Sequence, residues 1–178
     1  AMDVGVERSV TYLYGLQSHG IKPGLTRTRA LLGSLGDPHR SFRSIHVGGT
    51  NGKGSTAAMI ASVLGSRGYR VGLYTSPHLI DFTERIQVNG RVIPSDRVWA
   101  MTEKIRQASD ECLSEPPTFF EATTVMAFAC FAEAGVDCAV IEVGLGGRFD
   151  ATNVLTPLVS VITTIGLDHQ EYLGTTPE

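Results

Sequence analysis

An α/β fold with a mostly parallel sheet and flanking helices is the class that the sequence predicts. Four β-rich segments recur at 45–47, 71–74, 139–143 and 158–165, with helix-length segments between them. Two of these, "AVIEV" and "LVSVITTI", are almost continuously apolar, as strands covered on both faces are. A glycine-rich loop follows the first β-rich segment and opens a helix-like segment. Strand, helix and strand at this spacing favour a parallel sheet.

Two helices are predicted before the first strand. Residues 6–20, "VERSVTYLYGLQSHG", carry apolar side chains at helical spacing and end at a glycine. A shorter helix is predicted over 25–35, and "GDPHRS" is then a turn. These elements lead into the first β-rich segment.

A small β-hairpin is predicted to interrupt the parallel order. In "ERIQVNGRVIP" two alternating segments flank Asn89-Gly90, a dipeptide typical of two-residue hairpin turns. A helix over 95–109, the linker "SEPP" at 114–117 and a further helix follow it. The hairpin is therefore an excursion from an otherwise parallel sheet.

The composition indicates one domain of ordinary size in the cytoplasm. The chain has 178 residues, 42% of them hydrophobic and 19% charged, with a net charge of −3. These values argue against a nucleic-acid or membrane-surface partner, and no apolar run approaches the roughly 20 residues that cross a bilayer. The N-terminus has no signal-peptide pattern. Cys112, Cys130 and Cys138 are expected to be reduced thiols, because they lack a metal-binding spacing.

The loop in "HVGGTNGKGST" has the parts of a phosphate-binding loop. Glycines let backbone N–H groups converge on phosphate oxygens, a lysine offsets charge, and a helix N-terminus stands behind them. The residues that supply these parts are Gly48, Gly49, Gly52, Lys53 and Gly54, with Ser55 opening the helix. The spacing departs from G-x-x-x-x-G-K-S/T, because Val47 stands where the first glycine is expected and Gly54 follows the lysine.

The glycine-rich segments have two other interpretations. The loop after the first strand is alternatively a turn without a ligand, although four closely spaced glycines are costly without a reason. "GLGGRFD" superficially resembles a dinucleotide fingerprint, but Phe149 stands where the third glycine is needed. We therefore expect a nucleoside triphosphate at the first loop.

Glu142 is the most unusual residue, because a carboxylate inside the apolar run "AVIEVGLGG" is costly to bury without a partner. It either pairs with a base such as Arg148 or binds a metal at the carboxyl edge of the sheet, where ligands of α/β sheets gather. His169 follows the next strand and is expected at the same edge as Glu142 and Lys53, with Asp168 as a rival for a charged role.

Five segments together resemble the folylpolyglutamate synthase/dihydrofolate synthase family of the Mur ligase superfamily. They are "HVGGTNGKGSTAAMI", "YTSPHLIDFTERIQVNG", "TFFEATTVMAF", "IEVGLGGRFDATNV" and "ITTIGLDHQEYLG". They occur in order over essentially the whole chain, and T-N-G-K-G-S is the form that this family's loop takes. The resemblance implies a P-loop NTPase-like Mur ligase central domain.

The resemblance also implies roles for matching residues. The ATP-binding loop would be Asn51, Gly52, Lys53, Gly54 and Ser55, and the magnesium ligands would be Ser76, Glu142 and His169. The catalytic residues would be Lys53, Glu142 and His169. The pteroate or folate site would be Thr118, Phe119, Phe120, Glu121, Phe149, Asp150 and Ala151. Thr118 and Glu121 also have the spacing of a helix capping box, and both roles are compatible.

The implied reaction is ATP- and Mg²⁺-dependent ligation of L-glutamate to dihydropteroate or to a folate such as tetrahydrofolate. A substrate carboxylate attacks the γ-phosphate, and the glutamate amine attacks the acyl phosphate that results. Phe119, Phe120 and Phe149 offer apolar surface to the aromatic rings. The loop in "SPHLIDFTER" would close over the substrate. The full-length enzyme is expected to be a monomer.

The chain stops at "LGTTPE", whereas family members continue into a lysine-bearing segment and a C-terminal domain. We therefore expect residues 1–178 to form a truncated ATP-binding domain that has no ligase activity by itself. Two alternatives are a Mur-type cell-wall amino-acid ligase and a non-catalytic nucleotide-binding fragment. The segment at 118–121 and the "SPHL" loop argue against the first alternative.

Overall fold

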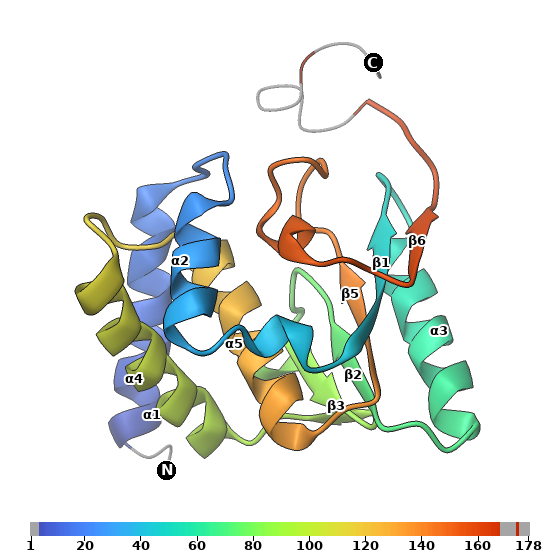
Figure 1. The fold of residues 1–178 in the computed structure, drawn as a ribbon, viewed down its shortest axis with the longest axis horizontal. Coiled ribbons are helices and arrows are strands. Elements are labelled where there is room, and N and C mark those ends of the chain that lie inside the picture. The colour runs from blue at the N-terminus through green and yellow to red at the C-terminus, as the bar shows by residue number, and fades with distance from the viewer. Residues whose placement is uncertain (1–3, 168–173, 175–178) are drawn as a thin grey trace.

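The computed structural model describes residues 4–167 and 174, and within them six strands form one sheet in the order β4-β3-β2-β5-β1-β6 (Figure 1). Strands β2, β5, β1 and β6 are parallel, and β3 and β4 are antiparallel to their neighbours. The strands are β1 (Arg43–Gly48), β2 (Val71–Tyr74), β3 (Ile86–Val88), β4 (Arg91–Val92), β5 (Cys138–Glu142) and β6 (Val159–Ile162). The predicted mostly parallel sheet with a hairpin excursion is confirmed.

Helices cover both faces of this sheet (Figure 1). Helix α3 packs on one face, where Val47, Ala57 and Val140 belong to one buried cluster. The remaining helices form a thicker layer on the other face, with α5 nearest the strands. The helices are α1 (Val4–Gly15), α2 (Thr26–Ser34), α3 (Lys53–Ser66), α4 (Ser95–Cys112) and α5 (Phe119–Ala134).

Helix α5 is the centre of the larger core, because its residues from Glu121 to Phe131 are all buried. Its packing on the sheet is close. A Cβ built on Gly72 of β2 would lie 2.7 Å from the Phe131 ring, so only glycine lets this ring rest on the strand. The close approach fixes the distance between helix and sheet, and with it the position of the helix N-terminus.

The helices and the hairpin turn agree with the sequence predictions apart from their ends. Helix α1 ends at Gly15 and continues as the 3-10 helix Leu16–His19 (η1), which reaches the predicted stop at Gly20. Asn89 and Gly90 both have positive φ, 51° and 72°, as a type I′ hairpin turn requires. Helix α4 runs three residues past its predicted end.

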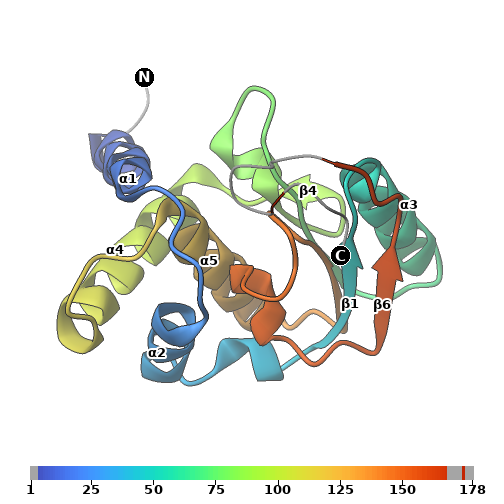
Figure 2. The ribbon, with the colours of Figure 1, turned by 90° about the horizontal axis from the view of Figure 1, so that it is seen from above.

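The last strand differs from its prediction in length and in burial. Strand β6 ends at Ile162 rather than at 165, and Val159 and Ile162 are 52% and 61% exposed. The expectation that both of its faces are covered is therefore wrong for the described residues. The reason is its position at the edge of the described sheet, beside β1 and away from α5 (Figure 2). Strand β5 lies between β2 and β1 and is buried along its whole length.

The cysteines agree with the expectation of reduced thiols. In the part of the chain that the structure describes, Cys112, Cys130 and Cys138 are all free, and the last two are buried. Burial raises the pKa of the Cys130 thiol to about 12, which suppresses its reactivity. Among the described residues, no helix combines the length and apolar character needed to cross a membrane.

Candidate active site

The glycine-rich loop leaves β1 at the carboxyl edge of the sheet and leads directly into α3. Gly52 has a φ of 80° and precedes Lys53, the first residue of the helix. Gly49 has a φ of 128°, and a Cβ there would overlap the Thr163 hydroxyl. The first turn of α3 therefore lies at the loop with its positive dipole end, the arrangement that binds phosphate.

Lys53 folds back over the loop. Its Nζ donates a 3.1 Å hydrogen bond to the Thr50 carbonyl, and its charge lowers the pKa of Glu142. A flexible ammonium that bonds a backbone carbonyl exchanges this acceptor readily for a phosphate oxygen. The lysine is thus held at the loop, near enough to the Glu142 carboxylate for its charge to act on that group.

A second chain segment, residues 163–166 after β6, clasps the first half of the loop. The Thr50 amide donates to the Thr164 carbonyl at 2.6 Å, and the Thr163 hydroxyl donates to the Asn51 carbonyl at 2.8 Å. The Thr50 hydroxyl accepts from the Gly166 amide at 2.9 Å. Sequence reasoning missed this clasp, because no local pattern links residues more than 110 positions apart.

Glu142 lies at the end of β5 with its carboxylate beside the loop. Its Oε2 accepts a 2.9 Å hydrogen bond from the Ser76 amide, and the Gly54 amide also donates to the carboxylate. Burial raises the pKa of Glu142, while these two donors and the Lys53 charge act to lower it. In the described residues its charged neighbours are Lys53 and Arg85 rather than Arg148, the partner considered from the sequence.

The structure brings Lys53, Ser76 and Glu142 together at one edge, as expected from the sequence. His169 and Asp168 lie outside the described residues. Magnesium prefers oxygen ligands, and a carboxylate has about four acceptor positions, of which the Ser76 and Gly54 amides use two. The remaining acceptor positions of the Glu142 carboxylate therefore fit a hard cation, although no group of three or more His, Cys, Asp or Glu suited to a metal occurs among the described residues.

Thr118 and Glu121 form the predicted capping box at the start of α5. The Thr118 amide donates to Glu121 Oε2 at 2.7 Å, and the Glu121 amide donates to Thr118 Oγ1 at 3.2 Å. Arg27 of α2 adds an ion pair to the same carboxylate, with Nε 3.0 and 3.1 Å from its two oxygens. Arg27 was not identified from the sequence. Its pairing with Glu121 fixes the helix N-terminus against a helix 94 positions earlier.

An aromatic cluster surrounds Phe119. Tyr14 of α1 stacks on its ring at 5.8 Å with an interplanar angle of 8°, and the Arg85 guanidinium lies 5.1 Å from the ring centre. His78 joins these neighbours, because its Nδ1 accepts from Arg85 at 2.7 Å and its Nε2 is 3.1 Å from the Tyr14 hydroxyl. The segment after β2 is therefore tied to α1 and to the start of α5.

The tip of this segment presents two apolar side chains to solvent. Leu79 and Ile80 are 91% and 92% exposed. The Glu84 carboxylate accepts hydrogen bonds from the amides of Leu79, Ile80 and Asp81 at 2.8 to 3.0 Å, and so organises the tip. Closure of this loop over a substrate remains a prediction, and its exposed apolar tip is compatible with it.

The segment after β5 is organised around Asp150. The carboxylate accepts from the amides of Leu145 at 2.7 Å and Thr152 at 3.0 Å, from the Thr152 hydroxyl, and from the Gly144 amide. Burial raises the pKa of Asp150, and these hydrogen bonds oppose the rise. Phe149 next to it is 60% exposed, whereas Ala151 is buried.

Phe120 forms the link between α5 and this segment. Its ring lies where a Cβ on Gly144 would stand, 2.3 Å from the position that such an atom would take. The ring also packs against Tyr74 with a centroid distance of 6.1 Å. Phe120 therefore supports the segment after β5 from below, and Phe149 is the aromatic side chain of the predicted substrate residues with the most open surface.

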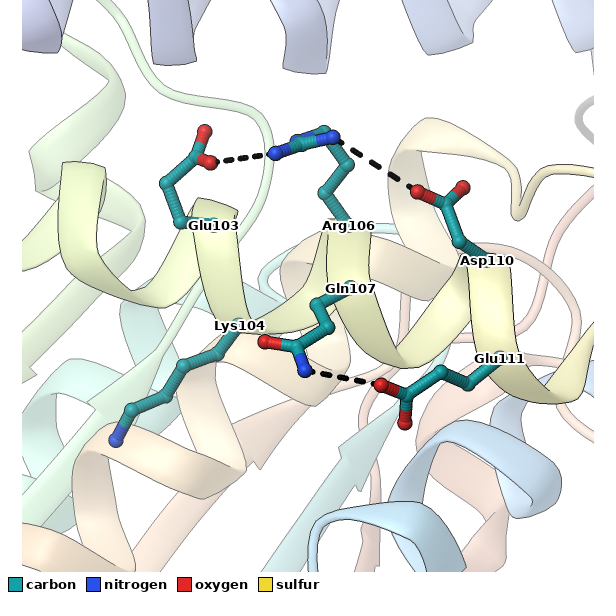
Figure 3. Close-up of a pocket in the computed structure, with 6 residues that line it drawn as sticks. All are labelled: Glu103, Lys104, Arg106, Gln107, Asp110 and Glu111. Carbon is teal, nitrogen blue, oxygen red and sulfur yellow. Dashed lines mark hydrogen bonds and ion pairs between the residues drawn. The ribbon is translucent and has the colours of Figure 1, made fainter.

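A hollow on the surface of α4 is lined by residues of that helix alone (Figure 3). Arg106 bonds Glu103 at 2.8 Å and approaches Asp110 at 3.8 Å, and Gln107 donates to Glu111 at 2.9 Å. These neighbours are three or four positions apart on one helix, so they are the intrahelical pairs of a solvated face. The hollow is lined by Glu103, Lys104, Arg106, Gln107, Asp110 and Glu111.

Comparisons with known proteins agree with this geometry. The chain is 47% identical over 172 residues to the dihydrofolate synthase/folylpolyglutamate synthase of Bacillus subtilis, covering 94% of this chain and 40% of that relative. A solved folylpolyglutamate synthase from Thermotoga maritima matches with a TM-score of 0.85 and 49% identity, over 91% of this chain and 38% of that one. The E. coli FolC structure in complex with DHPP and ADP matches with a TM-score of 0.87 and 37% identity, over 95% and 41% of the two chains.

The chain thus spans about 40% of the length of the relatives that it matches. The family model of the Mur ligase middle domain matches residues 47–178, which include the loop, β5 and the clasp at 163–166. The likeness covers most of the chain in both sequence and fold. The chain belongs to the Mur ligase family and carries its middle domain.

Proposed function

We propose that this chain is the ATP-binding part of an enzyme that ligates L-glutamate to dihydropteroate or to a folate. The observation that carries the proposal is the buried Glu142 carboxylate, bonded by the Ser76 and Gly54 amides and placed beside the lysine of a phosphate-type loop. A cation bound with a triphosphate at this edge of the sheet would compensate the buried negative charge of Glu142. The relatives' names, and the ADP and DHPP in the E. coli structure, support the same reaction.

The loop would hold the phosphates of ATP. Asn51, Gly52, Lys53, Gly54 and Ser55 lie at the N-terminus of α3, where negative charge is favoured, and the Gly54 amide bonds the Glu142 carboxylate. On binding, the Lys53 ammonium would leave the Thr50 carbonyl for the β- and γ-phosphate oxygens. Its charge would offset the negative charge that develops during transfer of the γ-phosphoryl group.

Ser76, Glu142 and His169 would hold Mg²⁺. When bound, the ion supplies positive charge against the phosphates. The protein's own contribution is to fix the carboxylate, and the Ser76 and Gly54 amides do this without using all of its acceptor positions. Lys53, Glu142 and His169 are the residues to which we assign catalytic roles.

The substrate would lie between the start of α5 and the segment after β5. Thr118, Phe119, Phe120 and Glu121 build the first wall, and Phe149, Asp150 and Ala151 belong to the second. The substrate carboxylate attacks the γ-phosphorus, the bond to the β,γ-bridging oxygen breaks, and ADP leaves. The amine of L-glutamate then attacks the acyl carbon, phosphate leaves, and the amine loses a proton. Positioning of the reacting groups accounts for much of such catalysis.

Residues 1–178 would thus be the N-terminal and central ATP-binding domain of a longer cytoplasmic enzyme, active as a monomer on small-molecule substrates. The glutamate and adenine sites would come from the remaining length that the relatives have. The chain alone would bind nucleotide but would not catalyse the ligation.

The test has two arms. Isothermal titration of this chain with a non-hydrolysable ATP analogue, with and without Mg²⁺, should show binding that requires the ion. Incorporation of labelled glutamate into dihydropteroate or tetrahydrofolate should occur in the longer enzyme and not in this chain. A thermal shift with UDP-muramyl peptides and none with pteroates would favour the cell-wall ligase, and nucleotide binding without any effect of pteroates would favour a non-catalytic module. Either result would overturn the proposal.

A further inference from the structure

A buried chain of hydrogen bonds connects the middle of β1 to the segment after β5. His46 of β1 is 8% exposed, and its Nε2 lies 2.7 Å from Oγ1 of Thr152, a residue with no exposed surface. The Thr152 hydroxyl in turn donates to the Asp150 carboxylate. Three polar side chains thus run through the interior, where an apolar set would be less costly to bury.

The direction of each hydrogen bond follows from the number of protons. Thr152 has one hydroxyl proton, and the Asp150 carboxylate takes it. The hydroxyl oxygen therefore acts as acceptor toward His46, whose Nε2 must carry a proton. Burial lowers the pKa of His46, so the ring is the neutral Nε2–H tautomer at neutral pH. A donor on Nε2 is the property of His46 that the chain uses.

The Asp150 carboxylate also holds the backbone of the residues that precede it. Its second oxygen accepts from the Leu145 amide at 2.7 Å, and the Gly144 amide also donates to the carboxylate. Together with the two donors from Thr152, these amides occupy about all four acceptor positions of the carboxylate. The carboxylate is therefore the anchor of loop 144–151, and the Thr152 hydroxyl is one of the four donors that fix its orientation.

We propose that His46 is a positioning residue for the substrate-facing loop 144–151 and acts through Thr152 and Asp150. This inference rests on the proposed function, because that function places the substrate against Phe149 and its neighbours. His46 does not touch the substrate. It orients the Thr152 hydroxyl, which bonds the Asp150 carboxylate. The carboxylate in turn holds loop 144–151 in the position in which it would contact the pteroate ring.

The first experiment measures the loop itself. Hydrogen exchange of the Gly144 and Leu145 amides should be about fivefold faster in His46→Phe and in Thr152→Val, since one buried hydrogen bond is worth about 1 kcal/mol. His46→Gln keeps an N–H donor and Thr152→Ser keeps the hydroxyl, so the Gly144 and Leu145 amides of both variants should exchange at the wild-type rate. His39→Phe is the control, because it removes a different imidazole, which is half-buried and packs on Phe128.

The second experiment measures substrate binding in the longer enzyme. His46→Phe should raise the KM for dihydropteroate or tetrahydrofolate about tenfold and leave the KM for ATP within about twofold, and His46→Gln should restore the value. The double variant His46→Phe/Thr152→Val should be no worse than either single one, because both break the same chain.

The outcomes separate the two proposals. Unchanged exchange at 144–145 in both His46→Phe and Thr152→Val overturns the positioning role, whatever the enzyme does. Equal effects of His46→Phe and His46→Gln on exchange also overturn it. If exchange is faster in His46→Phe and Thr152→Val but the wild type binds neither pteroate nor folate, the proposed function is wrong. The role of His46 in holding the loop would then still stand.

Discussion

The Ser76 amide donates a 2.9 Å hydrogen bond to Oε2 of Glu142 and so joins the segment after β2 to the end of β5. The two strands are parallel neighbours, with Tyr74 opposite Ile141. Because parallel strands end at the same edge, the register of the sheet itself brings this amide and this carboxylate together. The site depends on the pairing of β2 with β5 as much as on the loop.

Replacement of Glu142 by Gln should abolish the Mg²⁺ dependence of ATP binding. The change removes the negative charge and keeps the side-chain volume, so circular dichroism should show a folded chain. Turnover in the longer enzyme should fall about 100-fold or more, since a metal's stabilisation of transition-state charge is worth several kcal/mol. Glu133→Gln, which affects an acid paired with Arg97 and Lys104, is the control and should leave both readouts unchanged. Mg²⁺-dependent binding retained in Glu142→Gln would exclude the carboxylate as a metal ligand.

Gly54→Ala should weaken ATP binding about tenfold, because overpacking costs about 1–3 kcal/mol and about 1.4 kcal/mol is tenfold in affinity. The added Cβ would lie 3.3 Å from Oε2 of Glu142, so either the carboxylate or the start of α3 must shift. Gly65→Ala in the same helix meets nothing within 4 Å. It should raise the free energy of unfolding by about 0.5–1 kcal/mol without an effect on binding. Equal ATP affinities of the two variants, measured by titration calorimetry, would contradict the steric argument.

Arg27→Met should lower the free energy of unfolding by about 2 kcal/mol, because it leaves a buried carboxylate without its charged partner. The side chain of Glu121 is 4% exposed in this pair. Arg40→Met is the matched comparison, since the Arg40–Asp37 pair is 3.7 Å long and largely exposed. It should change stability by no more than about 0.5 kcal/mol. Urea denaturation of both variants checks the difference, and equal shifts would show that burial of Glu121 does not matter.

The stability of the chain should fall as the pH drops below the ordinary histidine pKa of 6.5. Burial lowers the pKa of His46, so between the folded and unfolded pKa values this ring is protonated in the unfolded chain and neutral in the folded chain. The unfolded state then binds more protons, and the free energy of unfolding rises with pH and is lost progressively as pH falls from 6.5 through the lower folded pKa. Urea titrations between pH 5 and 8 should show a shallower decline for His46→Gln than for the wild type.

The comparison of the two proteins isolates His46, because the other titrating groups are present in both. His39 and His78 also have lowered pKa values, and Glu142 and Asp150 have raised ones. Parallel curves for the wild type and His46→Gln would show that the His46 ring is accessible to protons in the folded chain.

Most of the sheet could be predicted because its signals are local. The apolar run of β5 and the Asn89-Gly90 turn each determine their own conformation, and both are found as expected. The exposure of β6 could not be predicted, because "LVSVITTI" has the composition of a covered strand and its burial depends on which elements lie beside it. Burial of a strand is a property of its neighbours.

The candidate site divides in the same way. Lys53 and Glu142 stood out because a lysine among glycines and an acid in an apolar run are locally unusual. Arg27 and His46 were missed, because each acts through one contact with a residue about 100 positions away. The roles of Thr118 and Glu121 as a cap were visible from their spacing, whereas the ion pair that buries Glu121 was not.

The clasp between Thr50 and Gly166 has a thermodynamic consequence. Its hydrogen bonds make the shape of the glycine-rich loop and the path of the backbone past Ile165 two aspects of one conformational equilibrium. A ligand that favours one form of the loop must, by reciprocity, favour the matching form of the 163–166 segment by the same free energy. A change in the conformation of the 163–166 segment is therefore transmitted to the glycine-rich loop, and a change in the loop is transmitted to the segment.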